Sequence, residues 1–320
     1  MTSTSVVRPP RLFPGARVAL VCPSGAVLER DDLVRASELC SALGLVPVLM
    51  PNTSRRFGYL AGTDDERRAD LQRAIDDEGY AAVWAVRGGF GTTRILRALD
   101  FSSLQARPRI LLGFSDITTI LLKAHADTGL VTFHGPVSRN GLTSFAREHL
   151  ERVLFDPSPP GRLSLPKSPA GVMVPREPRV VTIAPGSAEG KLIGGNLTLI
   201  QCLIGTGALP SLDGAILFLE ETSEDLYRVD RMFAHLRDAG LLAGLAGVAI
   251  GLFTDMRKGT EGGIRGFDEV LREYLEPLGI PAARGFPIGH VDDQWTLPIG
   301  AMARLDADAG ALHLLEAGVA

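Results

Sequence analysis

Cysteine is scarce in this sequence. The chain of 320 residues contains three cysteines, Cys22, Cys40 and Cys202. Their number is odd, and no two of them have the spacing of a metal-ligand pair or a redox motif. The sequence therefore argues against a disulfide framework, and we expect a protein of a reducing compartment, the cytoplasm.

Long apolar runs and an excess of one charge are also missing. No stretch approaches the ~18 consecutive apolar residues of a membrane span, and the first residues, MTSTSVVRPPRLFPG, contain no apolar core of signal-peptide length. The formal net charge is −4, and acidic and basic residues are interspersed. We therefore expect neither nucleic acid nor a membrane surface as a partner.

Metal and nucleotide motifs are absent as well. The six histidines include no pair at metal-ligand spacing and no H-E-x-x-H motif. The glycine-rich segment RGGFG lacks both the Lys-Ser/Thr of a phosphate loop and the spacing of a dinucleotide fingerprint. We expect no metal and no cofactor.

What is present is the pattern of an α/β protein. Hydrophobic residues make up 45% of the chain and charged residues 22%, so a sizeable core is expected. Apolar strand-like runs alternate with helical spacings, and Thr63 with Glu66 forms a capping box. This alternation predicts a parallel sheet with helices on both faces, whose strands are residues 16–22, 45–50, 81–86, 109–114 and 130–135.

The pattern breaks at a segment rich in Pro, Ser and Gly, residues 155–185. We divide the chain into an N-terminal domain (1–145), a connection (146–185) and a C-terminal domain (186–320). In the last we predict a strand ending in FLEE, a helix that stops at Gly240, a strand LAGVAIGLF, a helix at 267–275, and a terminal hairpin that turns near 308–310.

Ser115 is the first candidate for chemistry. The strand RILLGF runs into Ser115-Asp116, and the following residues have a helical pattern. A serine at such a turn projects its hydroxyl above the sheet edge, where the amide of Asp116 points at the same space. The motif departs from G-x-S-x-G, because position 117 is Ile. A helix N-cap is the competing interpretation of Ser115.

Glu220 and His290 are the second and third candidates for chemistry. Glu220 directly follows the apolar run AILFL, and a carboxylate there is suited to accept an imidazole N–H. His290 lies in the Gly/Pro-shaped segment GFPIGH. The alternatives are a run of acids that opens the next helix and an ordinary surface histidine. Together, a hydroxyl, a carboxylate and an imidazole at element ends indicate serine-nucleophile hydrolysis.

The turn Arg87-Gly88-Gly89-Phe90-Gly91 follows a predicted strand and exposes backbone N–H groups at the carboxyl edge of the sheet. Gly88 and Gly89 are candidates for binding an anion or an oxyanion, or they form a plain tight turn. Arg87 is suited to pair with a substrate carboxylate, or forms a structural salt bridge; Arg228 and Arg231 are further candidate cations. His134, in TFHGPV, is expected to line the pocket without doing chemistry.

These segments together resemble a known family. Eight blocks carry the resemblance, in this order: VALVCPSG, RGGFGTTR, LLGFSD, FHGP, GKLIGGNLTLIQCLIGT, FLEE, DRMFAHLRDAGLL and GFPIGHVDDQWTLPIG. They are similar to the blocks of the LD-carboxypeptidases, serine peptidases that include the microcin C self-immunity peptidases. The resemblance implies an N-terminal, flavodoxin-like parallel-sheet domain, a second, smaller mixed α/β domain, and an active site in the cleft between them.

The resemblance also implies roles for individual residues. Ser115 would be the nucleophile, Glu220 the orienting acid and His290 the base, with the amides of Asp116 and Gly89 as the oxyanion hole. Members are usually cytoplasmic homodimers without a metal that release a terminal D-alanine from muropeptides. The immunity branch cleaves peptidyl-aminoacyl nucleotides and stacks the nucleobase on a tryptophan. Residues 155–185 contain no Trp, which favours the muropeptide branch. A non-catalytic ligand-binding protein is the third alternative.

Overall fold

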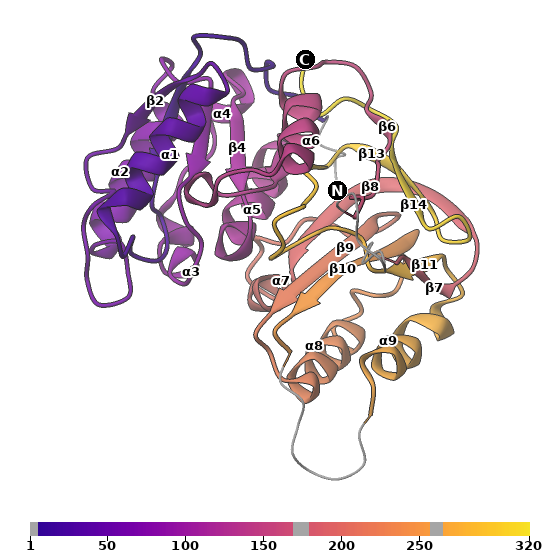
Figure 1. Cartoon of the computed structure of the whole chain (residues 1–320). Coiled ribbons are helices and arrows are strands. Elements are labelled where there is room, and N and C mark those ends of the chain that lie inside the picture. Colours follow the sequence, from indigo (N-terminus) through magenta and orange to yellow (C-terminus); the bar gives the residue numbers. More distant parts are fainter. Residues whose placement is uncertain (1–5, 169–178, 257–264) are drawn as a thin grey trace.

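A six-stranded sheet organises the N-terminal half of the computed structural model, which describes residues 6–168, 179–256 and 265–320 (Figure 1). The strand order is β12-β5-β4-β3-β1-β2, and all neighbours are parallel except β12 and β5. The bounds are β1 Arg17–Val21, β2 Val46–Leu49, β3 Ala82–Ala85, β4 Ile110–Gly113, β5 Thr132–His134 and β12 Leu297–Ile299. The order 2-1-3-4-5 is that of flavodoxin-like folds.

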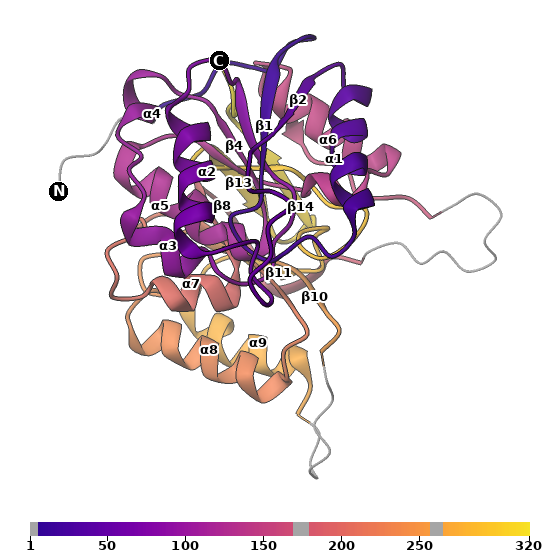
Figure 2. The same cartoon turned by 90° about the vertical axis from the view of Figure 1, so that its left-hand side faces the viewer.

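Helices cover both faces of this sheet. Figure 2 shows α1 and α6 on one side of the strands and α2, α4 and α5 on the other. The central strands are therefore apolar throughout; Val18, Ala19 and Leu20 of β1 are completely buried. The bounds are α1 Arg30–Ala42, α2 Asp64–Asp76, α3 Thr92–Ile95, α4 Ser103–Ala106, α5 Thr118–Thr128 and α6 Ser144–Leu154, with the 3-10 helices η1 Leu96–Ala98, η2 Ser115–Ile117 and η3 Ser138–Asn140.

Local sequence signals fix the helix ends as predicted. The side chain of Thr63 accepts a hydrogen bond from the N–H of Glu66, and the Glu66 carboxylate accepts one from the Thr63 N–H, so the predicted capping box is confirmed. Gly44 follows α1 with a φ of +75°, a conformation that favours glycine.

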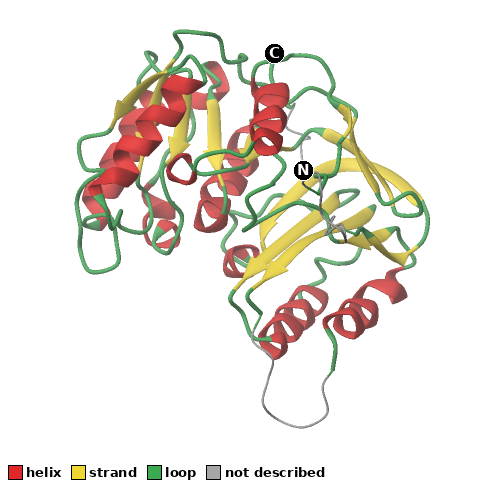
Figure 3. Cartoon of the chain, in the orientation of Figure 1, coloured by secondary structure: helices red, strands yellow, loops and turns green. Residues whose placement is uncertain are grey.

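The second sheet is mixed and has eight strands in the order β6-β14-β13-β8-β9-β10-β11-β7. Strands β8 to β11 are parallel to one another, and the other pairs are antiparallel. Figure 3 shows α8 and α9 together on one side of this sheet. The bounds are β6 Gly161–Arg162, β7 Val181–Ala184, β8 Ser187–Asn196, β9 Ile216–Thr222, β10 Gly247–Thr254, β11 Ala282–Arg284, β13 Met302–Asp306, β14 Ala311–Leu314, α7 Leu197–Leu203, α8 Leu226–Asp238, α9 Phe267–Leu275 and η4 Glu276–Leu278.

One strand from the C-terminal half of the chain belongs to the first sheet. β12 comes from the C-terminal part of the sequence but pairs antiparallel with β5 of the first sheet. Pro298 in β12 faces Phe133 in this pair, and the sheet edge tolerates a proline because no further strand needs its missing N–H. No local pattern in the sequence predicts this strand, since its three residues are too few to show a period.

The predicted connection also contains regular structure. α6 begins at Ser144, and β6 and β7 both join the second sheet. β7 pairs antiparallel with β11 at its edge. Residues 169–178, the centre of the segment in which we noted the missing tryptophan, lie outside the described residues.

Candidate active site

Ser115, His290 and Glu220 lie together in one hydrogen-bond chain. Nε2 of His290 is 3.1 Å from Oγ of Ser115, and Nδ1 of His290 is 2.8 Å from Oε2 of Glu220. Ser115 lies two residues after the end of β4 in the N-terminal domain, Glu220 is on β9, and His290 follows β11. Residues that are 70 to 175 positions apart thus meet between the two domains.

The backbone at Ser115 is unusual. Its φ is +63°, one of three positive values among the described residues other than glycine. Ser115 opens η2, and Phe114 occupies the N-cap position, so the N-cap interpretation of Ser115 is wrong. A strained residue at the junction of β4 and α5 is typical of a nucleophile held at a sharp turn. Gly113 permits the turn, because a Cβ there would lie 3.0 Å from a methyl group of Ile117.

Glu220 and its neighbour Glu221 have different partners. Glu220 is completely buried, and its Oε1 has no hydrogen-bond partner among the described residues. Glu221 instead accepts hydrogen bonds from Nδ2 of Asn196 at 3.0 Å and from the N–H of Thr198 at 2.9 Å. Glu221 therefore ties β9 to the start of α7, whereas Glu220 is left to face His290.

The environment of His290 favours its protonated form. Burial by itself would lower the pKa of His290, but the hydrogen bond and the negative charge of Glu220 outweigh burial and raise it above the ordinary 6.5. The ring of Phe114 lies 4.8 Å from the imidazole, measured between centroids. A base whose cationic form is stabilised in this way is suited to accept a proton and hold it briefly.

The glycine-rich turn lies directly against Ser115. A Cβ on Gly88 would be 3.2 Å from Oγ of Ser115. Neither Gly88 nor Gly89 donates its N–H to any acceptor in the described part of the chain, and the N–H of Asp116 lies in the first turn of η2, where helical amides are free. The turn also contacts the loop after β1, because the N–H of Gly25 donates to the Gly88 carbonyl at 3.1 Å.

This contact lies at the point where the strand order reverses. β1 and β3 are neighbours in the sheet, and their following loops run in opposite directions, which is where doubly wound folds bind ligands.

The side chain of Asp116 has a role that the sequence did not reveal. It is 1% exposed, and its Oδ2 accepts hydrogen bonds from Oγ of Ser24 at 2.5 Å and from the N–H of Thr92 at 2.9 Å. Burial raises its pKa, although these two donors act in the opposite direction. Asp116 thus connects the loops after β1, β3 and β4. The sequence offered no spacing that would have linked Ser24 and Thr92 to it.

Arg87, the first residue of the turn, forms no ion pair with a carboxylate among the described residues. One of its Nη atoms donates to the carbonyl of Ala26, and burial, with the nearby charge of Arg139, lowers its pKa. Arg228 is differently placed, because Glu224 and Asp225 lie 3.5 and 3.6 Å from it. Of the candidate cations, Arg87 is the one that belongs to the glycine-rich turn, and its Nε lies 3.5 Å from the Cβ position of Gly25 in the loop after β1.

His134 and Cys22 are both buried. His134 has no exposed surface, and burial, together with the charge of His290, lowers its pKa to about 3. It packs between the rings of Phe114 and Phe218, at 5.9 and 5.2 Å, so it lies behind the site and does not line a pocket. Burial raises the pKa of Cys22 to about 12, so this thiol stays protonated.

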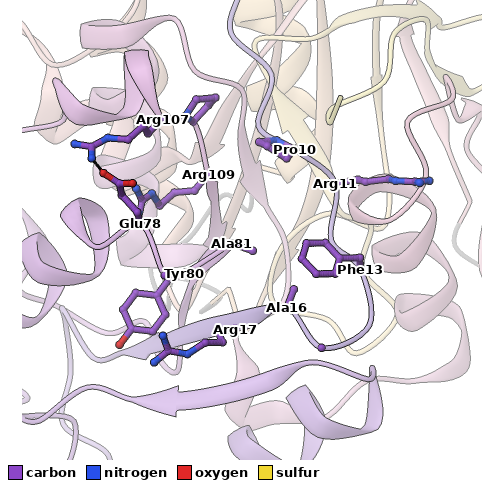
Figure 4. Close-up of a pocket in the computed structure, with 13 residues that line it drawn as sticks. Pro10, Arg11, Phe13, Ala16, Arg17, Glu78, Tyr80, Ala81, Arg107 and Arg109 are labelled. Carbon is purple, nitrogen blue, oxygen red and sulfur yellow. Dashed lines mark ion pairs between the residues drawn. The ribbon is translucent and has the colours of Figure 1, made fainter.

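One cavity lies far from the serine and another lies next to it. Figure 4 shows one of ≈ 530 Å³ at the amino-terminal ends of the strands, opposite the serine; there Arg17 lies against the ring of Tyr80, and Arg107 pairs with Glu78. A second cavity, of ≈ 350 Å³, adjoins the site, because Val291, the residue after His290, is part of its wall. Asp292 and Gln294 also line this second cavity.

Residues 6–168, 179–256 and 265–320 contain no cluster of three or more His, Cys, Asp or Glu side chains arranged to hold a metal ion. None of the helices in these ranges combines the length and the apolar character needed to cross a membrane.

The α/β fold and the hydrogen-bonded Ser–His–Glu arrangement are those of a serine-type hydrolase. Sequence profiles of the LD-carboxypeptidase N-terminal and C-terminal domains match residues 18–135 and 189–305. A putative carboxypeptidase of Streptomyces coelicolor is 37% identical, over 97% of this chain and 96% of its own length. The chain belongs to the LD-carboxypeptidase family and is an enzyme of the carboxypeptidase class.

Solved structures agree with this assignment. The muramoyltetrapeptide carboxypeptidase from Oxalobacter formigenes is 30% identical, with a TM-score of 0.79 over 93% of this chain and 98% of that chain. The microcin C7 self-immunity protein MccF, solved with aspartyl sulfamoyl adenosine, is 24% identical, with a TM-score of 0.89 over 98% of this chain and 100% of that chain. The second similarity shows the shared fold.

Proposed function

We propose that this enzyme releases a terminal D-alanine from L,D-linked muropeptides with Ser115 as nucleophile. The observation that carries the proposal is the hydrogen-bond chain from Ser115 through His290 to the buried Glu220. Membership of the LD-carboxypeptidase family supports the reaction class. The similarity to a muramoyltetrapeptide carboxypeptidase supports the substrate class.

The geometry suits acyl transfer in two steps. Nε2 of His290 takes the proton of Ser115 as Oγ attacks the carbonyl carbon of the scissile amide, and Glu220 holds the imidazole in the required tautomer. His290 then gives this proton to the leaving amine, and D-alanine departs. Water, deprotonated by His290, attacks the acyl-enzyme and restores the Ser115 hydroxyl.

The negative charge that develops on the carbonyl oxygen during the attack is stabilised by hydrogen-bond donors. The proposed oxyanion hole consists of the N–H of Gly89, which follows the glycine that lies against Ser115, and the N–H of Asp116, the residue after Ser115. One such donor contributes about 2.7–4 kcal/mol to transition-state stabilisation. Arg87 is the proposed partner of the substrate's terminal carboxylate, because it is the first residue of the same turn and forms no ion pair with a described carboxylate. Gly88 leaves room for the substrate beside Oγ.

Mass spectrometry of the products from a panel of muropeptides tests this function. The wild type is expected to shorten a tetrapeptide by one alanine, and Ser115→Ala to lose about 10⁶-fold in kcat while keeping its thermal unfolding temperature. A Ser115→Ala enzyme that releases alanine at the wild-type rate would disprove the proposed nucleophile.

The same panel separates the alternatives. An aminoacyl-adenylate analogue is included as a substrate. Cleavage of this analogue alone would mean that the substrate is a peptidyl-aminoacyl nucleotide, as in the immunity branch, and not a muropeptide. If the protein only binds ligands, the wild type would release no alanine. A variant that lacks both Glu220 and His290 would then bind the ligands with full affinity.

The cellular setting is part of the proposal. The three cysteines are free, in keeping with a cytoplasmic enzyme, and the family resemblance favours a homodimer. Light scattering of the purified protein is expected to give twice the 34.1 kDa of the chain, and cell fractionation is expected to recover the enzyme with cytoplasmic markers. A monomeric mass, or recovery outside the cytoplasm, would contradict the corresponding statement.

A further inference from the structure

Two exposed aromatic rings stand at the rim of the serine site. Tyr59 is 69% exposed and Phe90 49% exposed, and their rings form an edge-to-face pair with centroids 5.9 Å apart and an interplanar angle of 61°. A third ring, Phe57, is 63% exposed and lies two residues before Tyr59. Large exposed apolar groups that gather in one place commonly mark a binding surface, so this aromatic pair is a candidate ligand-binding surface.

The pair is tied to the catalytic loops by the backbone. The carbonyl of Tyr59 accepts a hydrogen bond from the N–H of Ala26 at 2.9 Å, and Ala26 belongs to the loop that contacts Gly88. Leu60 packs against the same turn, since a Cβ on Gly91 would lie 2.7 Å from its Cδ2. The backbone that carries the two rings is therefore linked to the loops around Ser115.

The distance to Ser115 can be bounded. Gly88 lies against Oγ of Ser115, with a Cβ position 3.2 Å away, and Phe90 follows two residues later. Since consecutive Cα atoms are about 3.8 Å apart, Cα of Phe90 lies within about 12 Å of Oγ. A tetrapeptide has three residues before its last amide bond, which span about 10–11 Å when extended. The group attached to the amino end of such a substrate is therefore at a distance from the scissile bond that matches the distance of the aromatic pair from Ser115.

We infer that Tyr59 and Phe90 form a subsite for the sugar ring at the amino end of a muramoyl peptide, an inference that rests on the proposed function. A pyranose presents C–H groups on one face, and these pack on an aromatic face, while its hydroxyl groups remain in water. An exposed edge-to-face pair offers such a surface without requiring complete burial of the ligand.

The test compares a muramoyl tetrapeptide with the same tetrapeptide without sugar. Tyr59→Ala and Phe90→Ala are each expected to lower kcat/KM for the muramoyl substrate about 5- to 10-fold, through KM, and to leave kcat/KM for the free tetrapeptide within about 2-fold. Tyr59→Phe and Phe90→Tyr retain the rings and should retain the wild-type values. Phe13→Ala is the matched control, because Phe13 is 57% exposed and lines the cavity at the opposite end of the sheet.

Each other outcome overturns the inference. An equal loss on both substrates would mean that the rings contact the peptide or support the loop, and no loss on the muramoyl substrate would mean that they contact nothing in it. A change of mass by light scattering in Phe90→Ala would assign the patch to a second copy of the chain. Failure of the wild type to hydrolyse even the free tetrapeptide would instead refute the proposed function itself, and the subsite with it.

Discussion

A Cβ atom on Gly289 would lie 2.5 Å from Oε2 of Glu220 and 2.7 Å from its Cβ. Gly289 has a φ of +109° and directly precedes His290. The missing side chain therefore lets the carboxylate approach the imidazole of the next residue, at 2.8 Å. This contact depends on glycine for two reasons, the backbone conformation and the absence of a Cβ.

Gly289→Ala is therefore expected to displace Glu220 or the His290 loop. A misplacement of about 1 Å costs on the order of 100-fold in rate, and kcat on a muropeptide measures this loss. Gly279→Ala is the matched control, because Gly279 also has a positive φ, +64°, but nothing lies within 4 Å of its Cβ position. The control should lose about 1 kcal/mol of unfolding free energy and no activity. Equal activity of both variants would contradict the steric argument.

Glu220→Gln is expected to change both the rate and its pH dependence. The neutral imidazole is the base, so kcat/KM of the wild type rises with pH around the raised pKa of His290, above 6.5. Without the charge of Glu220, burial dominates and the midpoint moves to a lower pH. The plateau falls by about 10⁴-fold, as expected for loss of the orienting carboxylate.

The same pKa shift has a consequence for stability. Because the pKa of His290 is raised by folding, its contribution to the unfolding free energy is fully present below pH 6.5 and is lost as the pH rises through the folded-state pKa. NMR titration of the His290 imidazole in the wild type and in Glu220→Gln measures this pKa shift directly. A midpoint that is unchanged in Glu220→Gln would show that the carboxylate is not what raises it.

Asp116→Ala is expected to destabilise the loops around the nucleophile. It leaves the Ser24 hydroxyl and the Thr92 N–H without their acceptor, which costs about 1–3 kcal/mol of unfolding free energy. Asp116→Asn keeps an acceptor oxygen and should retain most of the stability. Denaturant unfolding at one pH compares the two, and equal losses would argue that the negative charge, not the hydrogen bonds, connects the loops.

His134→Phe tests whether His134 contacts the substrate. Both ring nitrogens of His134 lack partners among the described residues, and the ring is packed among aromatic groups. The variant removes two buried polar atoms without a loss of hydrogen bonds, so unfolding free energy should change by less than about 1.5 kcal/mol. KM should remain within about 2-fold of the wild type. A rise of 10-fold or more in KM in a folded variant would place His134 at the substrate.

The sequence contained enough information to predict the regular elements. The apolar runs that became β1 to β5, the helix α9 and the hairpin of β13 and β14 follow from local periodicity, which depends only on neighbouring residues. The same holds for the turn at Ser115, since a strand that leads into a helix can be recognised within ten residues. The family resemblance went further and selected Glu220 and His290 among many acids and several histidines.

Contacts between distant segments could not be predicted in this way. Nothing in the sequence near Asp116 indicates Ser24 or Thr92, and nothing near Leu297–Ile299 indicates β5, because a short edge strand has no period of its own. His134 looked accessible in its motif, yet the second sheet covers it with Phe218. Burial of this kind depends on which surfaces meet, and that is not a local property.

The sequence by itself determined which segments become strands and helices and which side chains stand at their ends, since hydrophobic period and capping act over a few residues. Only the tertiary structure decided that a hydroxyl from one domain lies 3.1 Å from an imidazole of the other, and that Ser24 and Thr92 both donate to the carboxylate of Asp116. These distances are set by the packing of distant segments against each other, and that packing is a property of the whole chain.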